Sequence, residues 1–257
     1  MKSQPKAALQ LTIILSMQRP ENTNWPRMAG EGAAIVVSIL LAFAIDAWWE
    51  ERGLRIEEQQ VLQGLREEFL SVRNVLSAHL SEHLTDLQKL GDFLVAAEDG
   101  NVEEAGPIVD AAVAVLLSPM TSDLGSGTLA ALLSSGRIEI VTDRTLRAKL
   151  ASWDGVIGEV WDDQALNAKS VFEIHIPYFL AENIPAGAAM HRWYDEWTLP
   201  RKSLSDDPVM TSRLMSDVTL RGMIEMQYGY KRHTTVEFEI AIDAVDAILA
   251  EIESSIQ

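Results

Sequence analysis

The sequence predicts an all-α protein in which one N-terminal transmembrane helix continues into an extracytoplasmic antiparallel bundle of long helices. Three observations support this fold class. An apolar run near the N-terminus leaves no polar helix face, a ladder of apolar residues at helical spacing follows it, and no strand-like run longer than a few residues competes. We therefore expect an N-terminal cytoplasmic arm over residues 1–29, a transmembrane helix over 30–50 and a helical extracytoplasmic domain over 51–257.

The transmembrane helix is predicted from an uncharged run over residues 32–45, in which Ser38 is the only polar residue. A surface helix would need a polar face, whereas a buried core helix of a soluble protein is the alternative for so short a run. Trp25 lies before the run and Trp48-Trp49 after it. These tryptophans would be about 35 Å apart at roughly 1.5 Å per helical residue, which suits an aromatic belt at each membrane interface.

The charges that flank the run predict its orientation. The N-terminal arm holds four Lys or Arg residues and Glu50-Glu51 follow the span, so the positive-inside rule places the N-terminus in the cytoplasm. The first residues resemble a weak signal sequence without a small-residue cleavage site. Met17 and Met28 are alternative starts to Met1, and a start at Met28 would weaken the charge argument.

Asp46 is the first acidic residue after the apolar run, and two interpretations apply to it. It lies only about one helical turn before Glu50, within reach of lipid headgroups. We therefore expect an interfacial residue rather than a proton or ion site.

Composition excludes several classes of function. The chain has 257 residues, 47% of them apolar, and a net charge of −17. Residues 1–32 contain four basic and two acidic residues, so the remainder carries −19 and would repel nucleic acid and anionic membrane surfaces. Because the chain has no cysteine, it can form no disulfide, thiolate nucleophile or Cys-ligated zinc site.

One long amphipathic helix is predicted after the membrane span, since no proline occurs between Gly53 and Glu98. Its apolar ladder consists of Leu62, Leu65, Phe69, Val72, Leu76, Leu80, Leu84, Leu87, Leu90 and Leu94. A matching stripe near the C-terminus comprises Ala241, Val245, Ile248 and Ile252. We expect the two stripes to pack against each other, with the helices antiparallel.

Shorter helices are predicted between these two. One spans Pro107–Leu117, and another begins near Thr128 and is capped by Gly136. Residues 137–141, "RIEIV", favour a brief extended segment.

The second half of the chain predicts two further long helices. One starts at an N-cap, Thr142 or Asp143, and runs to Pro177, with a bend near Gly155 and Gly158. The last long helix opens at Asp207-Pro208 and continues toward Gln257.

The most suggestive chemical motif is "HLSEH", residues 79–83, which matches the inverted zinc-protease pattern H-x-x-E-H. His79 and His83 would lie one turn apart, with Glu82 as a base for metal-bound water, but a catalytic zinc needs a third ligand. His175, His191, His233 or a carboxylate would have to provide it. Because the pair lies within the apolar ladder, we expect half-buried structural histidines instead.

A second candidate is the aromatic segment "HRWYDEWTLPRK", His191 to Lys202. Trp193, Tyr194 and Trp197 cluster there with cations, a composition typical of partner hot spots. Aromatic residues that close one end of a helical bundle are the other interpretation.

Two stretches resemble a family of bacterial single-pass membrane proteins, domain of unknown function 6090. They are "GEGAAIVVSILLAFAIDAWWEERGLRIEEQQVLQGLREEF" and "TLAALLSSGRIEIVTDRTLRAKLASW", about a quarter of the chain. Here Trp48-Trp49 replaces the more usual Trp-Asn pair. The resemblance implies a membrane-anchored helical extracytoplasmic domain and supplies no catalytic residues.

We therefore expect a non-enzymatic module in the bacterial inner membrane that senses, scaffolds or binds an envelope partner. Its expected partners are the lipid bilayer and another protein, or a second copy through helical surfaces, and no nucleic acid. No catalytic, cofactor-binding or metal-binding residue is assigned. The alternative is a zinc-dependent hydrolase that uses His79, Glu82 and His83.

Overall fold

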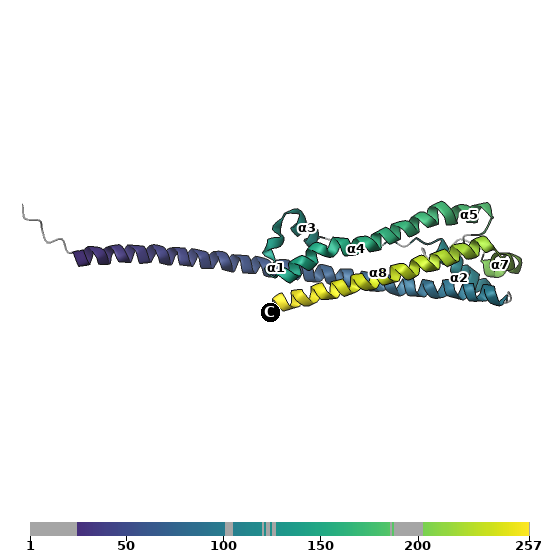
Figure 1. The fold of residues 1–257 in the computed structure, drawn as a ribbon, viewed down its shortest axis with the longest axis horizontal. Helices are drawn as coiled ribbons and strands as arrows, with labels where there is room; N and C mark the ends of the chain where they lie inside the picture. The colour runs from purple at the N-terminus through teal and green to yellow at the C-terminus, as the bar shows by residue number, and fades with distance from the viewer. Residues whose placement is uncertain are drawn as a thin grey trace, which may run out of the picture. The chain divides into compact units, whose positions relative to one another are not determined.

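The computed structural model describes residues 25–100, 105–119, 121, 124, 127–185, 187 and 203–256. These residues are overwhelmingly helical and contain no strand, which confirms the all-α class (Figure 1). The chain divides into two compact units, Met1–Gly53 and Leu54–Gln257. The first helix, α1 (Trp25–Asp99), contributes residues to both.

The first unit consists, where it is described, of the N-terminal part of α1. By length and apolar composition this is the one helix among the described residues that is able to cross a membrane. All side chains described between Met28 and Gly53 are exposed, including the whole apolar run. A core helix of a soluble domain would instead be mostly buried.

The second unit is a bundle of three long helices: the remainder of α1, α4 (Arg144–Ser170) and α8 (Val218–Ile256). Figure 1 shows α8 returning alongside α1. Arg73 pairs with Asp246, and Arg221 near the start of α8 pairs with Glu98 near the end of α1 at 2.9 Å. These contacts confirm the predicted antiparallel packing of the two helices.

Helix α4 is also antiparallel to α8. Lys149 Nζ lies 2.7 Å from Glu251 Oε1, whereas His233 Nδ1 lies 3.1 Å from Asp163 Oδ2. Early residues of α4 therefore contact late residues of α8. The helix is continuous over Gly155 and Gly158, and Asp143 is its N-cap, since the carboxylate accepts from Leu146 N at 2.8 Å.

Short helices close the two ends of this bundle. They are α2 (Gly106–Leu116), α3 (Thr128–Ser134), the 3₁₀ helix η1 (Arg137–Ile140), the π-helix η2 (Val171–His175), α5 (Ile176–Ala181), the 3₁₀ helix η3 (Leu204–Asp206) and α7 (Pro208–Met215). Helix α3 is held by Glu68 of α1, whose carboxylate accepts from the backbone N–H groups of Thr128 and Leu129 at 2.6 and 3.3 Å. Because these N–H groups have no partner within α3, the carboxylate acts as its N-terminal cap.

The last long helix was predicted wrongly as one element. Helix α7 begins at Pro208 as expected, but it ends at Met215, and α8 begins at Val218. Asp217 separates them, because its Oδ1 accepts from the backbone N–H groups of Thr219 at 2.8 Å and Leu220 at 3.0 Å. This is N-cap geometry, so the carboxylate starts a new helix.

The predicted extended segment at 137–141 is likewise wrong. Arg137–Ile140 form a 3₁₀ helix, and only Val141 has extended backbone angles. Gly136 enters this turn at φ +68°, the left-handed region that favours glycine, as predicted from its capping position. Glu58 then fixes Thr142, accepting from its N and Oγ1 at 2.7 Å each.

The helix predicted to end at Pro177 continues past it. The π-helix Val171–His175 follows α4 directly, and Pro177 then lies in the first turn of α5, which ends at Ala181. A proline lacks the N–H that an uninterrupted α-helix would use, whereas it is tolerated in a first turn. The π-turn changes the hydrogen-bonding pattern just before this position.

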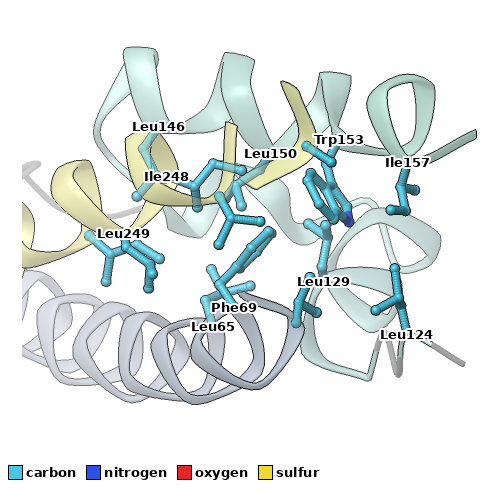
Figure 2. Close-up of a cluster of buried hydrophobic side chains, with 14 of the residues drawn as sticks. Leu65, Phe69, Leu124, Leu129, Leu146, Leu150, Trp153, Ile157, Ile248 and Leu249 are labelled. Atoms are coloured by element: carbon cyan, nitrogen blue, oxygen red, sulfur yellow. The ribbon is translucent and has the colours of Figure 1, made fainter. Parts of the chain in front are cut away.

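Two separate apolar cores hold the bundle together. The first core contains Leu62, Leu65, Phe69, Val72 and Leu76 of α1, Leu129 and Leu132 of α3, Leu146, Leu150, Trp153, Ile157 and Val160 of α4, and Phe238, Ala241, Val245, Ile248, Leu249 and Ile252 of α8. Figure 2 shows α3, α4 and α8 directing side chains toward Leu65 and Phe69. The predicted C-terminal stripe is fully buried here, which confirms its packing against α1.

The second core lies farther along α1 and is built mainly from short helices. Its members include Leu90 and Phe93 of α1, Val109, Ala112, Val113 and Leu116 of α2, Phe179 of α5, Leu214 and Met215 of α7, and Leu220, Met223 and Ile224 of α8. Helix α4 contributes nothing to it. The predicted apolar ladder of α1 therefore packs against α3, α4 and α8 in the first core, and against α2, α5, α7 and α8 in the second.

Candidate functional site

Buried polar side chains lie between the two cores. We define this polar layer as His83 and Asp86 of α1, Gln164 of α4, and Gln227, Lys231, Thr234 and Thr235 of α8, all of which are buried. Buried polar groups need partners because desolvation without a hydrogen bond costs free energy. The layer is therefore a part of the interior in which buried polar and charged side chains replace apolar ones.

An ion pair joins α1 to α8 in the layer. Lys231 Nζ lies 2.8 Å from Asp86 Oδ2, and the two side chains are only 2% and 1% exposed. Lys89 Nζ lies 3.8 Å from Asp86 Oδ1 and is partly in solvent. Removing one member of such a buried pair typically costs about 3–5 kcal/mol, because the other charge is left uncompensated.

The remaining polar groups on α8 differ in how they are satisfied. Thr234 Oγ1 and Thr235 Oγ1 donate to the carbonyl oxygens of Tyr230 and Lys231, at 2.9 and 2.8 Å. Gln227 is 1% exposed, and its Nε2 has no hydrogen-bond partner among the described residues.

The histidines of the H-x-x-E-H motif pack against an aromatic ring. His83 meets Phe238 edge-on at a centroid distance of 5.0 Å, and His79 stacks on the same ring at 6.1 Å, while Glu82 is exposed. Within the part of the chain that the structure describes, no group of three His, Asp or Glu residues could hold a metal ion. The two histidines and Phe238 form one packed unit at the edge of the first core.

His175 and His233, two of the histidines suggested as third ligands, contact residues outside this motif. His175 is buried, and its Nδ1–H donates to Leu116 O at 2.9 Å; burial lowers its pKa, against the raising effect of that hydrogen bond. His233 contacts Asp163 instead. His191 and the whole aromatic segment to Lys202 lie outside the described residues.

The end of the apolar run carries aromatic and cationic groups. Trp48 and Trp49 meet edge to face at 5.2 Å, and the guanidinium carbon of Arg52 lies 5.7 Å from the ring centroid of Trp48. Asp46, two residues before Trp48, is exposed. Ser38, the only polar residue of the run, donates from Oγ to Ala34 O at 2.8 Å, so its hydroxyl is satisfied within the helix.

Sequence reasoning missed the polar layer, although a signal was present. Gln227, Lys231 and Thr234 are spaced by four and three residues before Phe238, so they continue the helical phase of the buried C-terminal stripe with polar side chains. Asp86 similarly occupies a buried phase of α1. Polar residues at core phases predict buried pairing, but not which helix supplies the partner.

Comparison with known proteins adds no relative. No family model, no curated protein and no solved structure matches this chain. The similarity to domain of unknown function 6090 therefore stays a prediction, and functional inference depends on the residues described above.

Proposed function

We propose that this protein is a single-pass membrane protein whose helical domain senses, scaffolds or binds a partner in the cell envelope without catalysing a reaction. One observation carries the anchoring: the apolar run of α1 is exposed on every side. Its exposed large side chains are Ile35, Val36, Val37, Ile39, Leu40, Leu41, Phe43 and Ile45. So large a continuous apolar surface is unfavourable in water and favourable in the hydrocarbon of a bilayer.

The ends of the run support an interfacial position. Ser38 needs no external hydrogen bond, and the Trp48, Trp49 and Arg52 group has the aromatic and cationic composition of a membrane–water interface. Asp46 lies close enough to this group to reach lipid headgroups. The apolar core of the span then ends near Ile45.

The proposed orientation places the N-terminus in the cytoplasm and residues 51–257 outside it, in the inner membrane of a bacterium. The basic arm and Glu50-Glu51 support this orientation. A bacterial origin and membership of the domain of unknown function 6090 family are part of the same proposal, supported by the two similar stretches.

Binding is favoured over catalysis because the notable polar groups of the domain have structural partners. Asp86 pairs with Lys231, His175 donates to Leu116 O, and Tyr178 donates to Asp217 Oδ2 at 2.6 Å. Burial raises the pKa of Asp217, but hydrogen bonds from Tyr178 and from backbone N–H groups outweigh it and leave the pKa below its ordinary value. These groups hold helices together.

The partner is another protein or a second copy of this chain, bound through helical surfaces. Exposed aromatic side chains on α4 and η2, Trp161 and Phe172, offer contact area of the kind enriched at interfaces. The net charge of −19 beyond residue 32 disfavours nucleic acid.

Topology is the direct test of the anchoring. A reporter active only in the periplasm, fused after Gln257 of the full chain, should be active in bacterial cells, and the protein should fractionate with membranes. A matched variant with Ile39→Lys and Leu41→Lys in the span should lose membrane association, because each central Lys costs about 2.5–3.5 kcal/mol on insertion scales. Activity of a cytoplasm-only reporter would reverse the orientation, and soluble fractionation of the unchanged chain would exclude the anchor.

A further inference from the structure

The polar layer lies at one level of the three long helices, where α1 also buries Leu87. On α8 no buried apolar residue occurs between Ile224 and Phe238, a stretch of more than three turns, and the inward side chains there belong to the polar layer. The Asp86–Lys231 ion pair shows that α1 contacts α8 within this stretch. The contact of His233 with Asp163, the residue before Gln164, shows that α4 contacts α8 there too.

The layer contributes less to cohesion than the apolar cores on either side. A buried ion pair gains Coulomb energy but loses the hydration of both charges, so an apolar pair of similar volume is often equally or more stabilising. Cooperative units within a protein tend to separate where few apolar contacts connect them.

The backbone is also irregular beside the layer. The π-helix Val171–His175 begins one residue after α4 ends, and π-turns inside helices are frequent at functional sites. On α8, Thr234 and Thr235 bond back to the preceding turn, which tends to bend helices. The backbone of α8 stays α-helical through these threonines, so the departure from regular α-helical bonding is the π-helix that follows α4.

We propose that the helical domain opens in two steps, with the second core opening while the first core stays packed, and that the polar layer is the boundary between them. The second core opens first because it depends on α2 and α7, of 11 and 8 residues, which are too short to persist without their packing. The first core is closed by long stretches of α1, α4 and α8 and by the Lys149–Glu251 pair.

Opening exposes the apolar side chains of the second core to solvent. Leu90 and Phe93 on α1 and Ile224 on α8 are buried in the closed domain and would form one continuous surface when α2 and α7 leave. The opening belongs to the helical domain alone and is independent of the side of the membrane that it occupies.

Hydrogen–deuterium exchange of the full-length protein in detergent micelles tests the two steps. Backbone amides of α2 and of Leu220–Ile224 should be less protected than those of Leu65–Leu76 and Val245–Ile252, by roughly tenfold or more if opening is sub-global. The variant D86L/K231M should reduce this difference several-fold, because it replaces the ion pair with apolar side chains of similar size. Equal protection of both cores in the unchanged protein would overturn the proposal.

A matched control uses the exposed ion pair between the same two helices. The variant R73L/D246L removes the Arg73–Asp246 pair beside the first core and should leave the protection difference unchanged. If D86L/K231M does not fold, Thr235→Val provides the comparison, since it removes one buried hydroxyl that donates to Lys231 O within its own helix. A protection difference that neither layer variant reduces, or that the control reduces equally, would also overturn the proposal.

Discussion

The C-terminal half of α8 should be essential to the first core, and Ile248→Ala tests this with one side chain. Ile248 is 1% exposed and lies beside Leu146 and Leu150 of α4, as Figure 2 shows. Truncating a buried Ile to Ala typically costs about 2–5 kcal/mol, the lost transfer free energy plus a cavity term. This is a large share of the roughly 5–15 kcal/mol that stabilises an ordinary domain.

The assay is a thermal melt of the full-length protein in detergent, followed by circular dichroism. A loss of that size corresponds to a drop in the midpoint of about 4–20 °C, at roughly 2–4 °C per kcal/mol for a domain of this length. Ile240→Ala is the matched control, because Ile240 lies on the same helix and is 49% exposed. Equal midpoints for the two variants would refute the packing of α8 against α1 and α4.

Three further outcomes are expected. Ending the chain at Thr235 should abolish the cooperative melt, since each buried Val or Ile that is lost contributes roughly 1.5–3 kcal/mol; an unchanged midpoint would make that half of α8 an independent arm. His79→Ala and His83→Ala should change stability by no more than about 1–2 kcal/mol and leave metal content near zero, whereas stoichiometric zinc lost in both would support the hydrolase alternative. Burial lowers the pKa of His175 in the folded state, so the stability that its neutral form contributes is present above pH 6.5 and is lost as pH falls through the lowered value. Denaturant unfolding at a series of pH values should therefore show that the free energy of unfolding falls more steeply with acid for the unchanged protein than for His175→Gln.

The sequence predicted the long elements of the fold because their periodicity is strong. The ladder of α1 and the stripe of α8 have apolar residues at every third or fourth position, and both are buried as expected. Asp143 was predictable as an N-cap from its residue type and its place before a periodic segment. Leu84 is an exception, since it continues the ladder in sequence but is 49% exposed.

Two carboxylate contacts, one local and one between residues distant in sequence, account for the places where prediction failed. Asp217 is a strong N-cap, but the apolar pattern continues on both sides of it, so periodicity alone merges α7 and α8. Ile138, Ile140 and Val141 are β-branched and favour strands, yet Gly136 begins a 3₁₀ helix there, and Glu58 binds Thr142 just after it. Glu58 is distant in sequence, so its effect cannot be inferred locally.

The polar layer has a further physical consequence for how the helices find each other. Apolar ladders such as those of α1 and α8 repeat every three or four residues, so a shift of one helix by one turn would still bring apolar side chains together. Such a shift would separate Lys231 from Asp86 and leave two charges buried without each other, at a cost of several kcal/mol. The ion pair therefore fixes the register of α8 against α1 at some expense in stability. The buried Asp86–Lys231 pair thus has two effects in the proposed scheme: it selects one register of the closed helices, and it makes the boundary between the two cores less cohesive than an apolar contact would.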